Sequence, residues 1–259
     1  MISGGGVKGL ASLGAVHALA GLGYLRHVTL FAGTSVGSLL CAALAIGMTP
    51  KEVLAAFASH AYEPDYDFAG VYASYGLDSG KNLLAWIRAV LGRDYTFSDI
   101  LRQHDKRLVV CASNVSRGRA AYFSPETHPD MDVATAIRMS CSVPLYFAAV
   151  RHEGDVFADG CLVDNFPVDW ALREGGARRV LGVRLMTNAP RVETLDGYIA
   201  ALVACTLRDR DDPSRNRATI VDVNAGEVCS LALDMSPRDR RALFRSGARQ
   251  ARDYVKKNA

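Results

Sequence analysis

The sequence predicts an α/β fold in which a mainly parallel central sheet carries helices on both faces. Short apolar runs, typical of buried strands, alternate along much of the chain with longer runs of helical periodicity. The 259 residues are 49% hydrophobic and 22% charged, which is enough to bury one large core without disulfides. We therefore expect a single domain over residues 1–259.

The chain begins with a strand, a glycine loop and a helix. Residues 1–3 look like the end of a short strand, and residues 4–9 have the sequence Gly-Gly-Gly-Val-Lys-Gly before a helical run that ends near Gly21. Three consecutive glycines can turn several backbone N–H groups toward one point, and the following helix adds its positive N-terminal end. The loop is therefore suited to hold an anion or an oxyanion.

The same loop also satisfies the G-x-G-x-x-G pattern of dinucleotide sites. Such a site uses an acidic residue about 20 residues further on to bind the ribose, whereas the first acidic residue here is Glu52. Arg26 could instead meet a 2′-phosphate, so a nucleotide site stays open as an alternative. A P-loop fits less well, because Gly9 is not followed by Lys and Ser or Thr.

A G-x-S-x-G motif follows the next strand. The apolar run 27–32 leads into Gly33-Thr34-Ser35-Val36-Gly37, and the uncharged run 38–46 is typical of a buried helix. In a nucleophile elbow the serine occupies a sharp strand-to-helix turn with small residues two positions to either side. Ser35 is therefore the candidate nucleophile, with the preceding glycine loop as its oxyanion hole.

The rest of the chain continues the alternation after a mixed region. We interpret residues 51–106 as a cap-like insertion with helices at 51–60 and 82–91. Its tyrosine-rich stretch 62–75 either packs within the cap or lines a path for lipid. Beyond it we expect strands at 108–112, 120–123, 180–185 and 219–223, a hairpin near 152–155, helices at 133–139, 168–173 and 198–206, and a basic amphipathic helix at 237–259.

Ser35 needs a partner that accepts its proton. Hydrolases with a nucleophile elbow order Ser, acid and His along the chain, but all six histidines lie at or before position 152. The three that could serve in principle sit in charged or loop-like surroundings typical of the surface, namely His104, His128 and His152. Asp159 instead ends the apolar run 156–158 and precedes Gly160. We therefore predict Asp159 as the base, with a turn-closing aspartate as the alternative.

Three motifs in this order resemble those of the patatin-like phospholipases. They are residues 3–9, residues 33–37, and Asp159-Gly160-Cys161 with Asn165 and Pro167 after it; the likeness also takes in residues 95–99 and 140–144 and covers about residues 1–190. Cys161 stands where that family usually has Gly or Ala, and Lys8 where it often has Arg or Lys. The very short first strand suggests that an upstream segment is missing.

The resemblance implies a three-layer patatin-like fold and a catalytic dyad of Ser35 and Asp159 without histidine. It further implies hydrolysis of lipid acyl esters with no metal and no cofactor, and an oxyanion hole from the backbone of Gly4, Gly5, Gly6, Val7 and Lys8. We therefore expect a lipid acyl hydrolase of the phospholipase A or lysophospholipase type. The alternative is a lipid- or nucleotide-binding module whose serine is unreactive.

The charge and cysteine patterns indicate the cellular compartment and the kinds of binding partner. Six scattered cysteines without a C-x-x-C pair, and no signal peptide, favour a cytoplasmic protein with reduced thiols. Residues 238–257 carry a net charge of +6, so the remainder is close to neutral and nucleic acid is not an expected partner. This tail either docks peripherally on anionic membranes or packs on the core with a basic outer face. The acidic stretch 209–213 lacks the Gly and Glu of a calcium loop.

Overall fold

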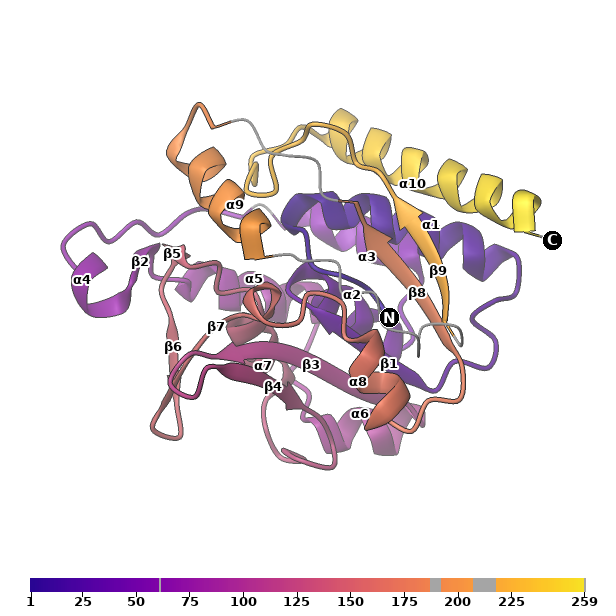
Figure 1. Cartoon of the computed structure of the whole chain (residues 1–259), viewed down its shortest axis with the longest axis horizontal. Coiled ribbons are helices and arrows are strands. Elements are labelled where there is room, and N and C mark those ends of the chain that lie inside the picture. The colour runs from indigo at the N-terminus through magenta and orange to yellow at the C-terminus, as the bar shows by residue number, and fades with distance from the viewer. Residues whose placement is uncertain (61, 187–191, 207–217, 259) are drawn as a thin grey trace.

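The computed structural model describes residues 1–60, 62–186, 192–206 and 218–258 (Figure 1). Helices and strands alternate along most of this length, as expected. In chain order the elements are η1 (Gly6–Lys8), α1 (Gly9–Gly21), β1 (Leu30–Thr34), α2 (Val36–Ala45), α3 (Pro50–Ser59), α4 (Val71–Ser74), β2 (Gly76–Asp78), α5 (Lys81–Leu91), α6 (Phe97–His104), β3 (Arg107–Asn114), β4 (Arg119–Phe123), α7 (Val133–Ser140), β5 (Leu145–Phe147), β6 (Val150–His152), β7 (Asp155–Asp159), η2 (Gly160–Leu162), α8 (Val168–Arg173), β8 (Val180–Leu185), α9 (Leu195–Thr206), β9 (Ala218–Val223) and α10 (Pro237–Asn258).

The central sheet is mixed. β1 and β3 pair in parallel, as do β8 and β9, and Ile2 joins the two pairs through parallel bridges to Gly33 and Val183. β4, β6 and β7 run antiparallel to their neighbours, because tight turns rather than helices connect β3 to β4 and β6 to β7. The α/β class with helices on both faces is thus confirmed, and the antiparallel strands gather at the β3 side of the sheet.

One edge of β3 brings two strand ends together. β1 occupies this edge from Arg107 to Cys111, and β7 continues along the same edge from Ala112 to Asn114, since β4 takes the opposite edge. Because β1 runs parallel to β3 and β7 antiparallel, the two strands end facing each other. Thr34 lies opposite Cys111, and Asp159 lies opposite the next residue, Ala112. The residue after β1 and the last residue of β7 therefore meet.

The core lies on both faces of the sheet. Along β9, Val221 and Val223 are buried in the main core with α1 and α2, whereas Ile220 points to a second apolar cluster under α8. This alternation is the two-residue period of a strand covered on both sides. The second cluster comprises Phe166, Val168, Ala171, Leu172 and Val180.

The residues that we interpreted as a cap pack into the main core. Val53 on α3, Ile87 on α5 and Phe97 on α6 are buried in the same cluster as α1 and α2. α3 begins at a capping box formed by Thr49 and Glu52, and α6 at one formed by Thr96 and Asp99. These reciprocal hydrogen bonds fix where both helices start; α3 starts within one residue of the predicted position, whereas α6 was not predicted.

Two elements start three residues away from their expected positions. The strand predicted at 27–32 is β1, which begins at Leu30 and continues to Thr34. It begins there because Leu30 pairs with Arg107, which is the first residue of β3. The helix predicted at 198–206 is α9, which begins earlier, at Leu195.

Among the described residues, no helix combines the length and the apolar character that crossing a membrane requires.

The C-terminal helix α10 lies along α1 (Figure 1). The two helices approach closely through reciprocal glycines: a Cβ on Gly14 would lie 1.8 Å from the Phe244 carbonyl oxygen, and a Cβ on Gly247 1.8 Å from that of Ala11. Leu243, Phe244 and Ala251 are thereby buried. Of the two expected arrangements, the tail thus packs on the core with its basic side chains on the outer face, and docking of that face on anionic membranes stays a prediction.

Candidate active site

Ser35 occupies the sharp turn between β1 and α2. Its backbone has φ 53° and ψ −133°, a conformation that non-glycine residues rarely adopt and that is typical of strained functional positions. The flanking glycines are required by space: a Cβ on Gly33 would lie 2.4 Å from the Gly37 carbonyl oxygen, and a Cβ on Gly37 2.3 Å from that of Ile2. The motif therefore forms the nucleophile elbow that the sequence predicted.

Hydrogen bonds on both sides hold the elbow in place. The Ser35 amide donates to Ser140 Oγ over 2.7 Å, and Ser140 Oγ in turn donates to the Cys111 carbonyl oxygen over 2.5 Å. Ser38 Oγ donates to the Ser35 carbonyl oxygen over 2.6 Å. Ser140, which is fully buried, ties the strained turn to β3. No pattern in the sequence indicated a role for Ser140.

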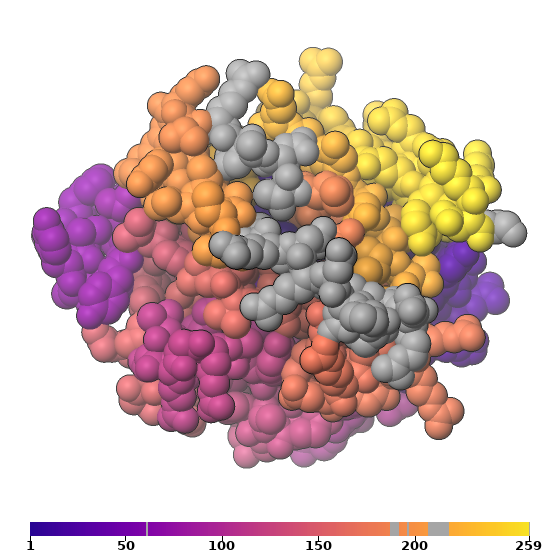
Figure 2. All heavy atoms as spheres, in the orientation of Figure 1, coloured from indigo at the N-terminus to yellow at the C-terminus, as the bar shows by residue number. Residues whose placement is uncertain are grey.

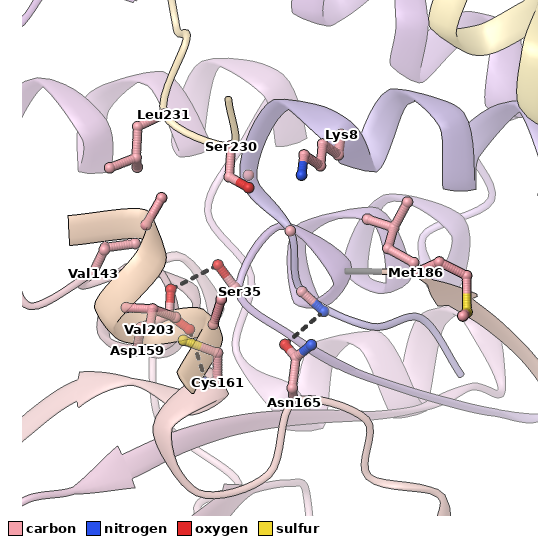
Figure 3. Close-up of a pocket in the computed structure, with 16 residues that line it drawn as sticks. Lys8, Ser35, Val143, Asp159, Cys161, Asn165, Met186, Val203, Ser230 and Leu231 are labelled. Atoms are coloured by element: carbon pink, nitrogen blue, oxygen red, sulfur yellow. Dashed lines mark hydrogen bonds between the residues drawn. The ribbon is translucent and has the colours of Figure 1, made fainter. Parts of the chain in front are cut away.

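Ser35 and Asp159 are in direct contact (Figure 3). Ser35 Oγ donates to Asp159 Oδ2 over 2.7 Å, and the second carboxylate oxygen, Oδ1, accepts from the Cys161 amide over 2.9 Å. The Asp159 backbone is fixed as well, because its amide donates to the Ser142 carbonyl oxygen and its carbonyl oxygen accepts from Ser113 Oγ. The two side chains that were predicted to be catalytic thus form a buried, hydrogen-bonded pair.

Burial raises the pKa of Asp159 to about 6. Desolvation is the main cause, and the hydrogen bonds from Cys161 and Ser35 oppose it by stabilising the carboxylate. A carboxylate with such a pKa is still mostly ionised at neutral pH but is more basic than an exposed one. This is the balance that a general base needs.

The three candidate histidines lie elsewhere. The rings of His128 and His152 pack against Phe123 and Phe157, and that of His104 packs against Tyr95. Within the part of the chain that the structure describes, no imidazole hydrogen-bonds to Ser35 or to Asp159.

The glycine loop abuts the nucleophile: a Cβ on Gly4 would lie 3.0 Å from that of Ser35. Of the five residues predicted to form the oxyanion hole, three use their amides elsewhere. The Gly4 amide donates to Asn165, that of Val7 to the Ser230 carbonyl oxygen and that of Lys8 to the Gly5 carbonyl oxygen. The amides of Gly5 and Gly6 have no partner among the described residues, so they are the donors left for an oxyanion.

Segments distant in the sequence shape this loop. Asn165 Oδ1 accepts the Gly4 amide over 3.1 Å, and the Ser230 carbonyl oxygen accepts that of Val7 over 3.0 Å (Figure 3). Gly6 has φ 55°, and a Cβ there would lie 1.9 Å from the Ser230 carbonyl oxygen. A side chain at Gly6 would therefore displace the segment that covers the loop.

Lys8 contributes its side chain to the site rather than its backbone. It is 7% exposed and lines the pocket that contains Ser35 and Asp159, with its amino group pointing into that pocket (Figure 3). It has no hydrogen bond or ion pair within the described ranges, and desolvation lowers its pKa from the usual value. A buried cation without a partner is costly unless it meets an anion from outside the chain.

Two cavities meet at Ser35. The catalytic pocket, of about 80 Å³, is lined by the dyad, the glycine loop and Lys8, with Val203 of α9 as part of its cover. The apolar cavity, of about 110 Å³, extends from Ser35 between α2, α3 and α5 and is lined mainly by Leu39, Phe57, Leu83, Trp86, Ile87 and Phe147. A carbonyl placed at Ser35 could therefore have a polar group on one side and a hydrocarbon chain on the other.

The described residues contain no cluster of three or more side chains able to hold a metal ion. The acidic stretch 209–213, which lacks the Gly and Glu of a calcium loop, lies outside the described residues. The groups that the structure gathers at Ser35 are a hydroxyl, a buried carboxylate and the glycine loop.

The site thus combines a serine on a sharp strand-to-helix turn, a buried carboxylate that accepts its hydrogen bond and an adjacent glycine loop, all on a mixed α/β sheet. The model of the patatin-like phospholipase family matches residues 1–172, which is most of the chain. The chain therefore belongs to the patatin-like phospholipase family.

Individual relatives are distant. A probable lipid hydrolase, 463L, of Invertebrate iridescent virus 6 is 27% identical over 67% of this chain and 62% of its own length. A cGAMP-activated phospholipase of Pseudomonas aeruginosa is 28% identical over 67% of this chain and 55% of its own. The chain thus spans little more than half the length of these two relatives. The uncharacterized protein YqhO of Bacillus subtilis is 28% identical over 99% of this chain and 97% of its own.

Solved structures agree on the fold. VipD from Legionella pneumophila superposes with a TM-score of 0.62 at 17% identity, covering 99% of this chain and 66% of VipD. ExoU from Pseudomonas aeruginosa, in its complex with SpcU, gives 0.52 at 18% identity, covering 99% of this chain and 51% of ExoU. At such identities the likeness shows the fold alone.

Proposed function

We propose that the chain hydrolyses fatty-acyl esters of phospholipids through a Ser35–Asp159 dyad, without a metal. The observation that carries this proposal is the 2.7 Å hydrogen bond from Ser35 Oγ to the buried Asp159 carboxylate. The family of the chain and the names of its relatives support a lipid as the substrate. Such a substrate resides in membranes, so the enzyme would act as a peripheral protein at a lipid surface.

The reaction has two steps. Ser35 Oγ attacks the ester carbonyl carbon while Asp159 Oδ2 takes the hydroxyl proton, and the Gly5 and Gly6 amides hold the resulting oxyanion. Collapse of this intermediate breaks the ester bond, and the proton on Asp159 passes to the departing lysophospholipid oxygen. Water then attacks the acyl-serine carbonyl carbon with Asp159 again as base, and as the acyl–Oγ bond breaks Asp159 returns the proton to Ser35 Oγ, which releases the fatty acid.

The two cavities suit the two parts of a phospholipid. The apolar cavity beside Ser35 is lined by aliphatic and aromatic side chains, which favours it as the site of the acyl chain being removed. Lys8 lines the other cavity, close to the glycine loop. Its buried amino group is placed to meet the phosphate of the leaving part, which supports a phospholipid over a neutral lipid.

A lipid-release assay tests this function. Purified protein is given phosphatidylcholine, phosphatidylglycerol, lysophosphatidylcholine and triacylglycerol, and the free fatty acid is measured. We expect release from the phosphate-containing lipids in preference to triacylglycerol, no release with Ser35→Ala, and no change when a chelator is added. Lys8→Met should lower activity on phospholipids more than on triacylglycerol. No release from any ester, or a loss with chelator that calcium restores, would overturn the proposal.

A further inference from the structure

Helix α9 is apolar both on its buried side and on its exposed side. Its inner face is formed by Ile199, Ala200, Val203 and Ala204, of which the last three line the catalytic pocket. Leu195, Tyr198 and Leu202 recur at i, i+3 and i+7 on the other face and are 56%, 48% and 42% exposed. Residues 197–206 contain no charged residue. An ordinary surface helix is polar on its outer face, so this one is built for an apolar surrounding.

The exposed apolar surface continues beyond α9. The helix contacts β5, whose first residue, Leu145, is 54% exposed although Tyr146 and Phe147 beside it are buried. β5 pairs with β2, where Gly76 lies opposite Leu145. The segment just before β2, which includes α4, carries Phe68 at 73% and Tyr72 at 91% exposure. We call this surface the apolar rim; its members are Phe68, Tyr72, Leu145, Leu195, Tyr198 and Leu202.

The elements of the apolar rim lie on one side of the molecule. Figure 1 shows α4, β2, β5 and α9 together at the left, and in Figure 2 the violet residues around α4 and the orange residues of α9 occupy that same side. Leu145 holds its outward position with φ 67°, a conformation that costs free energy for a residue other than glycine. An apolar side chain kept exposed by a strained backbone indicates a surface that meets something apolar.

The basic outer face of α10 is the other candidate for a lipid contact. Its exposed residues include Arg238, Arg241, Arg245, Arg249, Arg252 and Lys256, which share one face of the helix, but the apolar face of α10 is buried on α1. Charge alone would attract this face to anionic lipid in a salt-dependent way. The apolar rim, in contrast, can enter the hydrocarbon boundary of any bilayer.

We propose that the apolar rim inserts into the lipid surface that carries the substrate, and that α9 thereby connects the bilayer with the catalytic pocket. We assign a lipid surface to the apolar rim because α9 links the rim to the catalytic pocket: one face of this helix is exposed, and its other face covers Ser35. The rim's tyrosines and phenylalanine are also of the kinds that settle at the membrane boundary. The proposal rests on the proposed lipid hydrolysis for the nature of the substrate.

Vesicle binding at high salt isolates the contribution of the rim. The full chain is incubated with phosphatidylcholine vesicles, which are neutral overall, and bound protein is measured by co-sedimentation. Burial of one apolar side chain in the bilayer boundary strengthens binding by about tenfold or more. The double variant Tyr72→Ser/Leu202→Ser should therefore bind at least tenfold more weakly than the wild type. Release from vesicle phospholipid should fall in parallel, while hydrolysis of a short water-soluble ester is unchanged.

Matched controls test whether the loss of any exposed apolar side chain, or of surface charge, is enough to weaken vesicle binding. Leu22 and Val115 are 51% and 53% exposed but lie outside the rim, so Leu22→Ser/Val115→Ser should bind as the wild type does. Arg245→Ser/Arg249→Ser on α10 should also leave binding to neutral vesicles unchanged.

Several results would overturn the proposal. The wild type could fail to bind neutral vesicles, the rim and control variants could lose binding equally, or the rim variants could convert a dimer to a monomer, which would assign the rim to a second copy of the chain. A wild type that binds through the rim but hydrolyses no ester would contradict the proposed function and leave the rim intact.

Discussion

Two sides of the catalytic pocket differ in what holds them in place: the floor, which carries Ser35 and Asp159, is ordered by hydrogen bonds, whereas the cover, which includes α9 and Leu231, is apolar. On the floor, Ser35, Asp159 and Ser140 are linked to each other or to the backbone by hydrogen bonds of 2.5–2.9 Å. The cover consists of apolar side chains such as Val203 and Leu231, which fix no atom to such accuracy. Chemistry needs reacting atoms held within fractions of an ångström, whereas admission of a lipid chain needs only a compatible surface.

This difference predicts two kinds of variant. Changes on the floor should reduce activity on every ester, including short soluble ones. Changes in the cover and in the apolar cavity should matter only for long or membrane-borne substrates. A floor variant that affects only long substrates, or a cover variant that affects short soluble esters as well, would contradict this comparison.

The largest effect is expected on the floor, at Asp159. Asp159→Asn keeps the size of the side chain but removes the proton acceptor, so kcat on a soluble ester should fall by about 10²- to 10⁴-fold, to the level of Ser35→Ala. The double variant should be hardly worse than either single one, because the two residues act as a unit.

Histidine variants supply the control for this prediction. His104→Gln, His128→Gln and His152→Gln should retain nearly full activity, because their rings pack on aromatic residues away from Ser35. A histidine variant as inactive as Ser35→Ala, with an intact circular dichroism spectrum, would replace the dyad by a triad.

A smaller loss is expected from Ser140→Ala. The variant leaves the Ser35 amide without its acceptor, so the strained turn can relax and kcat should fall by about 10- to 100-fold with little change in KM. Ser124→Ala is the matched control, since Ser124 is equally buried but bonds to Thr127 outside the site. Equal kinetics for the two variants would show that the tie to β3 has no role in positioning Ser35.

The pH profile tests the floor without a mutation. Burial raises the pKa of Asp159 to about 6, and only the carboxylate accepts a proton, so kcat/KM on a soluble ester should decline as the pH falls through 6 and be about tenfold lower at pH 5. Carboxyl groups ionise with little heat, so this limb should hardly move with temperature, whereas a limb due to histidine would. A flat profile down to pH 5 would contradict the buried base.

The mildest effect is expected in the apolar cavity. Leu83 lines the cavity and the next residue, Leu84, does not. Leu83→Phe should therefore lower kcat/KM for long-chain esters by about fivefold and leave acetyl esters unchanged, because it shortens the space available to an acyl chain. Leu84→Phe should not change the chain-length profile. An equal loss on all chain lengths would remove the cavity from substrate binding.

The pair of Ser35 and Asp159 could be predicted from the sequence because each residue follows a short apolar run and has a glycine within two positions. Ser35 lies within a local five-residue motif, and Asp159 is the last residue of its strand. The alternation of strands and helices, a property of neighbouring residues, gave the fold class in the same way.

Features that depend on distant segments could not be predicted. Which amides of the glycine loop stay free is decided by Asn165, 161 residues beyond Gly4, and by Ser230. The apolar positions of α10 have the spacing of a membrane-binding helix, and only their contact with α1 shows that they belong to the core. No local pattern distinguishes these outcomes.

Labelling with a fluorophosphonate tests the dyad most directly, because this reagent phosphonylates only activated serines. The labelled protein is digested and the modified peptide is identified by mass spectrometry. We predict one adduct, on Ser35, none in Ser35→Ala, and labelling of Asp159→Asn that is slower by at least 100-fold. An adduct on another serine, or equal labelling rates for the wild type and Asp159→Asn, would contradict the account.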